Sequence, residues 1–413
     1  MIKLASSFFV CLSLPMAWAA HQEAKELKLE NQQPGISDIS CLDKNNHEKI
    51  FSFLSASEVA KFMLTKKSRD EISEVALRIC SSRPFFVTNQ EIEDDFFFSL
   101  EKGYCREMRL LDLSGSSFNP TMIKKLPALL VELSLDDVTN PTSDPSYVKE
   151  LLRVLSKFKN LKKLSLANHK ISHAFDQRLS AILNLTSLDL IENSIGDVEA
   201  YHISTTQGLT CLNLSRNFLE STGALHISSM ITLTCLDLSG NFLEDRGAQH
   251  LSTMANLISL NLNKNFIKDA GAHHISTMTS LTCLDLSGNF IEDTGAQSIS
   301  MMSGLTSLYL SKNSIRDTGA RCISTMTHLT SLDLRGNFIR NEGARHLSTM
   351  TSLTFLDLSE NFVISNNLDL SRNFIRDTEA RYISPMQSLY TLNLSSNSIE
   401  DPENHDISSR EDI

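Results

Sequence analysis

The sequence predicts an α/β solenoid, in which short parallel strands form a concave sheet and helices form the convex layer. Two observations predict this fold. One motif returns every 24 residues along most of the 413-residue chain. Within each copy, an apolar alternation typical of a strand is followed by an apolar stripe with helical spacing. The repeats therefore override the two or three globular domains that chain length alone would indicate.

The repeating unit is clearest at residues 281–296, which read LTCLDLSGNFIEDTGA. From residue 185 on, each copy places an asparagine eight residues after its first leucine, and degenerate copies precede at 108–113 and 130–135. The pattern L-x-x-L-x-L-x-x-N-x-I/L resembles the leucine-rich repeat, which implies a horseshoe spanning residues 108–400. The full copies begin at Leu161, Leu185, Leu209, Leu233, Leu257, Leu281, Leu305, Leu329 and Leu353.

Each motif position has an expected structural role. Leu284 and Leu286 alternate with polar residues, so both should point into a shared leucine core. Asn289 follows the strand, and we expect its amide to bond loop backbone groups that the sheet no longer pairs. The asparagine series is therefore interpreted as structural.

The second half of each repeat is expected to form a helix. Asp293 is interpreted as its N-cap, with Asp245, Asp269 and Asp317 in register. Ala296, Ile299 and Met302 make one apolar stripe, and the methionines are interpreted as packing residues. The preceding Gly-Ala pairs should let helix and strand approach closely.

Residues on the concave face are expected to contact a protein partner. We expect the chain to be a monomer and to bind no cofactor or metal. They form an acidic stripe beside a broken basic one, and Tyr309 is the aromatic candidate for a binding hot spot. The candidates are Asp189, Asn213, Arg216, Asp237, Asn261, Lys264, Asp285, Tyr309, Lys312, Asp333, Arg335 and Asp357.

Metal sites and catalysis are not expected. The acidic stripe does not converge as calcium requires, and the histidine series at 202, 226, 250, 274 and 346 is spaced too widely for zinc. The sequence contains no GxxxxGK[ST], HExxH or GxSxG motif, so we expect a non-enzymatic protein. Cys211 and Cys235 come within disulfide range on neighbouring strands, and we expect free thiols.

The net charge and the two ends of the chain indicate which partners are disfavoured and where the protein is localised. A formal net charge of −11 disfavours binding to nucleic acid or anionic membranes. Residues 1–20 read as a secretory signal, with Lys3, an apolar run and Ala17-Trp18-Ala19 before the cleavage site. No later segment is apolar enough to span a membrane.

The half-repeat between Asn361 and Asn373 predicts a local defect in the solenoid. Residues 401–413 should be a disordered tail.

The N-terminal region is expected to contain a linker (21–40), a helical domain (41–82) and a connector that caps the solenoid (83–107). Ser55 and Glu58 form a capping box. The helical stretch resembles an F-box, although Asp43 replaces the motif's proline and residues 45–47 depart from its pattern. By this resemblance, the adaptor-binding residues are Leu42, Ile50, Phe51, Phe53, Leu54, Val59 and Phe62.

The combination of this segment with Gly-Ala-x-x-[IL] repeats resembles the GALA-type F-box/leucine-rich-repeat effectors of host-associated bacteria. This resemblance implies secretion and recruitment of a target to a host SCF-type ubiquitin ligase through a Skp1-type adaptor. The alternative is an exported or periplasmic binding or adhesion protein whose N-terminal helices only cap the solenoid.

Overall fold

The computed structural model describes residues 85–86, 109–115, 126, 128–137, 146–169, 171, 182, 184–361, 367–369 and 391–393. Contacts divide the chain into two units, Met1–Phe53 and Leu54–Ile413, and every described residue belongs to the second. The expected signal, linker, F-box-like helices and tail lie outside the described residues, as does most of the expected connector.

The second unit is built on a parallel sheet of 12 strands that pair in chain order. Equivalent residues pair in register, so that Leu284 lies between Leu260 and Leu308. The strands are β1 (Phe85–Phe86), β2 (Leu110–Asp112), β3 (Glu132–Ser134), β4 (Lys163–Ser165), β5 (Ser187–Asp189), β6 (Cys211–Asn213), β7 (Cys235–Asp237), β8 (Ser259–Asn261), β9 (Cys283–Asp285), β10 (Ser307–Tyr309), β11 (Ser331–Asp333) and β12 (Phe355–Asp357).

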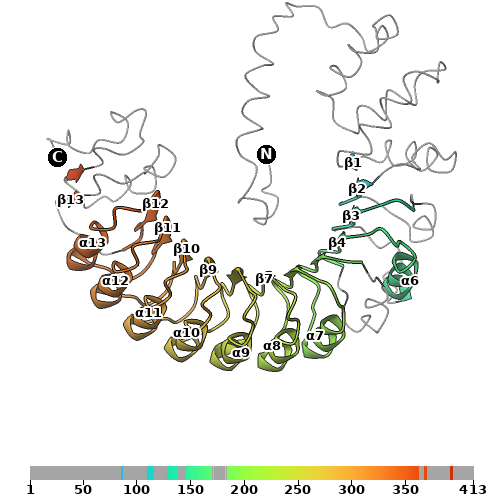
Figure 1. Ribbon diagram of the computed structural model, residues 1–413, viewed down its shortest axis with the longest axis horizontal. Helices are drawn as coiled ribbons and strands as arrows, with labels where there is room; N and C mark the ends of the chain where they lie inside the picture. The colour runs from blue at the N-terminus through green and yellow to red at the C-terminus, as the bar shows by residue number, and fades with distance from the viewer. Residues whose placement is uncertain are drawn as a thin grey trace, which may run out of the picture. The chain divides into compact units, whose positions relative to one another are not determined.

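Helices form a second layer on the outer side of the arc, and the strands line its inner side (Figure 1). Neighbouring helices need about 8–10 Å, whereas neighbouring strands need about 4.8 Å. The layer of strands must therefore be the concave one, as predicted. The helices are α6 (Ser146–Leu155), α7 (Asp197–Ser204), α8 (Ser221–Ile227), α9 (Glu244–Leu251), α10 (Asp269–Ile275), α11 (Asp293–Ile299), α12 (Asp317–Ile323) and α13 (Asn341–Leu347).

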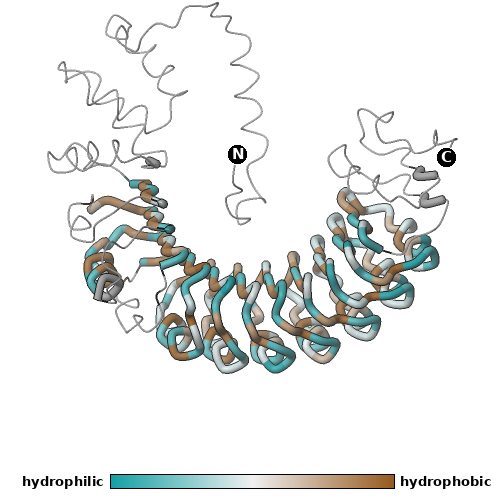
Figure 2. The backbone as a smooth tube through the Cα atoms, turned by 180° about the vertical axis from the view of Figure 1, so that it is seen from behind, coloured by the Kyte–Doolittle hydropathy of each residue, from teal (hydrophilic) through white to brown (hydrophobic). Residues whose placement is uncertain are grey.

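A continuous apolar core lies between the two layers. Leu284 and Leu286 are fully buried, which confirms their predicted inward direction, and Ala296 and Ile299 are fully buried beneath the helix. Met302 is 5% exposed but follows the end of α11, so it packs from the turn after the helix. Hydrophobic segments recur in each repeat (Figure 2), so each repeat buries its apolar surface against its neighbours.

The predicted structural role of the asparagines is confirmed. Asn289 is 4% exposed. Its Nδ2 donates to the carbonyl oxygens of Leu262 and Leu286, both at 2.9 Å. Its Oδ1 accepts from the backbone N–H groups of Asn265 at 2.9 Å and Ile267 at 3.0 Å. Each side chain thus satisfies buried backbone groups of its own repeat and the preceding one.

The predicted N-cap role of the aspartates is wrong by one residue and one repeat. Asp293 is the first residue of α11, and the N-cap is Glu292, without a side-chain cap bond. The Asp293 carboxylate instead accepts from the N–H groups of Arg316 at 2.8 Å and Gly319 at 2.9 Å. These belong to the first turn of α12. Each such aspartate therefore caps the helix of the following repeat, and Asp197, Asp245, Asp269 and Asp317 do the same.

The glycine of each Gly-Ala pair makes room for this carboxylate. A Cβ on Gly295 would lie 2.5 Å from Asp269 Oδ1 and 2.7 Å from Ile291 Cγ2. These distances are shorter than carbon atoms tolerate, so a side chain would displace the cap. The glycine thus permits a close approach, but its nearest neighbour is the capping aspartate of the preceding repeat and not the strand that the sequence predicts.

The sheet ends at β12. The next strand, β13 (Asn367–Asp369), starts 12 residues after β12 instead of 24 and pairs with β14 (Thr391–Asn393) in a separate two-stranded sheet. This break coincides with the half-repeat in the sequence and supports the predicted defect. The segments 362–366 and 370–390 lie outside the described residues.

Candidate interaction surface

The acidic stripe lies at the point where each strand of the sheet ends. The Asp285 Oδ1 accepts a hydrogen bond from the Ser287 N–H at 2.8 Å, which turns the chain out of the strand. One carboxylate oxygen is therefore committed to the fold, and the other remains on the concave face. The same bond to the residue two positions on is made by Asp189, Asn213, Asp237, Asn261, Asp333 and Asp357.

Burial makes these carboxyl groups harder to ionise. Loss of hydration raises the pKa of Asp189 to about 6 and that of Asp333 to about 6. The same cause raises the pKa of Asp237 and of Asp285. Charge repulsion adds to it, from Asp237 two strands away at Asp285 and from the adjacent Asp357 at Asp333. The charge of the concave face thus depends on pH in the weakly acidic range.

The cation row consists of Arg216, Lys264 and Lys312, which are exposed and alternate with glycines. The backbone at this position is left-handed throughout, with φ of 53° at Lys264 and 64° at Gly288. A Cβ on Gly288 would lie 2.9 Å from Lys264 Cγ. The glycine thus leaves space for the aliphatic stem of the preceding lysine, which explains why the predicted basic stripe is broken.

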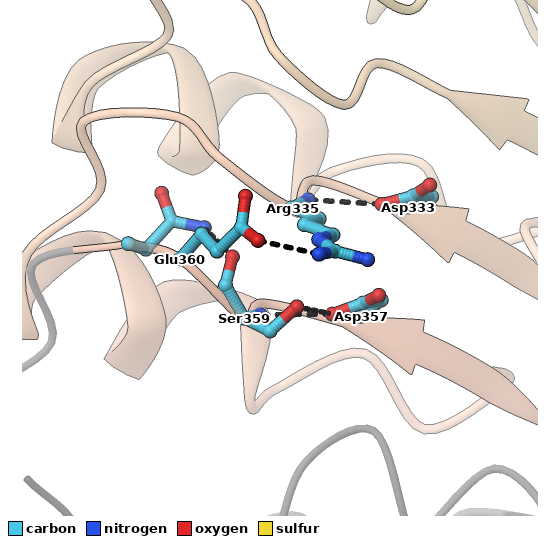
Figure 3. Close-up of polar contacts among 6 residues, drawn as sticks. Asp333, Arg335, Asp357, Ser359 and Glu360 are labelled. Atoms are coloured by element: carbon cyan, nitrogen blue, oxygen red, sulfur yellow. Dashed lines mark hydrogen bonds and ion pairs between the residues drawn. The ribbon is translucent and has the colours of Figure 1, made fainter. Parts of the chain in front are cut away.

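Ion pairs occupy both ends of this surface. Arg335 bonds Glu360 of the next repeat, and its own N–H donates to Asp333 Oδ1 at 2.9 Å (Figure 3). Arg216 pairs with Glu192 of the preceding repeat. Because these side chains are 41–69% exposed, the pairs orient charges more than they stabilise the fold.

Tyr309 interrupts the acidic stripe at β10. It ends β10 and pairs in register with Asp285 of β9 and Asp333 of β11. Its backbone carbonyl accepts from the Leu286 N–H, as the aspartates of other repeats do, and its side chain is partly exposed. The tyrosine therefore presents an aromatic ring between two carboxyl groups.

The phenylalanine ladder is a surface that sequence reasoning missed. Phe218, Phe242, Phe266 and Phe290 directly follow the structural asparagines and are 46–58% exposed. Consecutive ring centroids are 6.3, 5.8 and 6.1 Å apart, a normal distance for paired aromatic rings. Phe338 continues the series after a gap at Ser314. The signal was present as a recurrent phenylalanine at a variable motif position.

A cleft of about 600 Å³ opens at the amino ends of β2 to β5. Arg109, Lys159 and Lys162 line it and are exposed. These solvated cations make this end of the sheet basic, although the chain as a whole is acidic.

The histidine series lies on the convex helices. His202 and His226 approach Tyr201 edge-on, with ring centroids 5.4 and 5.2 Å apart. Within the described ranges, no group of three or more His, Cys, Asp or Glu side chains could hold a metal ion. Over the same residues, no helix has the length and hydropathy needed to cross a membrane.

Comparison with known proteins agrees with this geometry. Residues 231–291 and 303–362 match the family model described as Leucine rich repeat. The chain carries leucine-rich repeats. Among curated protein sequences, none matches it.

Among solved structures, the leucine-rich-repeat chain is similar to an internalin (inlF) from Listeria monocytogenes, with a TM-score of 0.51 and 20% identity over 84% of this chain and 97% of that one. This likeness supports the fold. Mouse RP105 in its complex with MD-1 gives a TM-score of 0.47 and 20% identity over 71% and 55% of the two chains. The plant peptide hormone receptor RGFR1 in complex with RGF2 gives 0.39 and 20% over 73% and 68%.

Proposed function

We propose that this leucine-rich-repeat protein is a non-catalytic scaffold that binds a protein partner across its concave face and the adjoining phenylalanine ladder. The observation that carries the proposal is the ladder itself, because a row of exposed aromatic rings is costly in water unless a partner covers it. Phe218 and Phe266 lie two residues after Arg216 and Lys264 of the cation row. Aromatic and arginine side chains together are typical of binding hot spots.

The finer proposal is that the protein is a secreted effector. The F-box-like helices at 41–82 would recruit a Skp1-type adaptor, and the repeats would hold a target for a host SCF-type ubiquitin ligase. It is supported by the motif match at Ile50, Phe51, Phe53 and Leu54 and by the signal-like residues 1–20. The alternative remains an exported or periplasmic adhesion protein with capping helices.

A pulldown experiment can distinguish adaptor binding by the N-terminal region from target binding by the repeats. Residues 21–413, without the expected signal, would be tested by pulldown with a purified Skp1-type adaptor and with a host-cell extract read by quantitative mass spectrometry. The Ile50→Asp/Leu54→Asp double variant should lose only the adaptor. The Tyr309→Ala/Phe266→Ser double variant should lose only the target. Gln297→Ala, exposed on α11, is the matched control.

The outcomes discriminate between the hypotheses. Adaptor binding that the first variant loses supports the ligase role, provided that circular dichroism shows an intact fold. Target binding without adaptor binding supports the adhesion alternative. If the Tyr309→Ala/Phe266→Ser variant retains every protein that the wild type captures, the proposed binding surface is wrong.

A further inference from the structure

Two cysteines face each other across neighbouring strands of the concave sheet. Cys211 opens β6, Cys235 opens β7, and the two residues pair in register. Such neighbours have Cα atoms about 4.8 Å apart, within the range of about 4.4–6.8 Å that a disulfide spans. Leu212 and Leu236, the next residues on these strands, are buried in the core, so the alternation of a strand places both cysteines on the concave face. Both are free thiols with partial exposure, so small reagents reach them.

Their proximity makes the two thiols chemically unequal. The neighbouring thiol lowers the pKa of Cys211 below its ordinary value and raises the pKa of Cys235 above it. Lys163, at the same position two strands away, also favours the Cys211 thiolate. Cys211 is therefore the attacking sulfur of the pair, because the thiolate is the nucleophilic form.

We propose that Cys211 and Cys235 are a redox-active dithiol that closes to a disulfide between β6 and β7, with a low-molecular-weight disulfide as the oxidant. The Cys211 thiolate attacks one sulfur of the oxidant, whose S–S bond breaks and releases one thiolate. Cys235 then loses its proton to solvent and attacks Cys211 Sγ, which releases the second thiolate. Two protein thiols are oxidised, and one small disulfide is reduced to two thiols.

Cys283 is an internal control for the effect of pairing. Cys283 occupies the same repeat position, but its in-register neighbours are Ser259 and Ser307. Two strand spacings separate it from Cys235, about 9.6 Å, beyond the reach of a disulfide. Serine occupies this position on neighbouring strands, so Cys→Ser variants should keep the fold.

The test uses the full chain, incubated with oxidised glutathione, alkylated without reduction and digested with trypsin. Trypsin cuts after Arg216, between the two cysteines, so mass spectrometry detects the bond as a linked peptide pair. The wild type and Cys283→Ser should both form the pair between Cys211 and Cys235. Cys235→Ser should instead accumulate glutathione on Cys211, because the second thiol is missing.

Two outcomes would overturn the proposal. One is a stable glutathione adduct on wild-type Cys211 without the linked pair. The other is reaction at Cys283 as fast as at Cys211, which would mean that the pairing confers no special reactivity. Circular dichroism of each variant would show that the comparison is made between folded proteins.

Discussion

At the scale of single residues, polar side chains carry most of the specificity of this fold. The leucines determine that a core forms, but Asn289 and Asp293 determine how one repeat meets the next, since each bonds backbone groups in two repeats or across their boundary. The sequence predicts the role of the asparagine but not that of the aspartate. The role of the asparagine follows from its position directly after the strand, whereas the backbone group that the aspartate bonds lies 23 residues away.

Replacing Asn289 with alanine should be strongly destabilising. Several buried backbone groups lose their partners, and each buried group left unpaired costs about 1–3 kcal/mol. We expect the free energy of unfolding to fall by about 2–4 kcal/mol in urea denaturation. The exposed control, Gln297→Ala, should change little. Equal effects of the two variants would contradict the buried role of the amide.

Asp333 should make stability depend on pH. An aspartate in the unfolded chain has a pKa of about 3.9, which is below the pKa of about 6 that Asp333 has in the folded protein. Between these values the folded state holds more protons, so the free energy of unfolding falls as pH rises through this window. Asp333→Asn keeps the acceptor for the Arg335 N–H but never ionises. It should raise stability by about 1–2 kcal/mol at pH 7.

The control for Asp333→Asn is the same urea denaturation at pH 4, where the wild-type carboxyl is largely protonated. The variant should there be no more stable than the wild type. A gain of equal size at both pH values would show that ionisation of Asp333 is not the cause.

At the scale of elements, the short helices depend on their neighbours. α12 has only seven residues, too few to be stable alone. Its first turn is capped by the carboxylate of the preceding repeat, and its glycine leaves room for that group. Helix and cap are therefore contributed by different repeats.

Asp317→Ala should loosen the start of α13 and leave α12 intact. The N–H groups of Arg340 and Gly343 lose an acceptor at 2.7 and 3.0 Å, at a cost of about 0.5–2 kcal/mol. Hydrogen exchange should accelerate at these two amides. The neighbouring exposed substitution Thr318→Ala is the control. Faster exchange confined to the first turn of α12 would restore the original N-cap interpretation.

At the scale of the solenoid unit, stability should be shared between adjacent repeats. Leu260 is 1% exposed and stacks between leucines of β7 and β9. Leu260→Ala should cost about 2–5 kcal/mol and accelerate hydrogen exchange most in β7, β8 and β9. The control is Ile258→Ala, at a side chain that is 49% exposed. An equal acceleration in β3 would argue against nearest-neighbour stability.

The sequence by itself determined the repeat length, the inward leucines, the buried asparagines and the order of strand and helix, because each depends on a local period or on one residue's hydrogen-bonding capacity. Only the tertiary structure decided which helix Asp293 caps, why Gly288 alternates with Lys264, and that phenylalanines from successive repeats stack. All of these depend on contacts between residues 23 or more positions apart in the sequence, and such contacts exist only once the repeats are stacked.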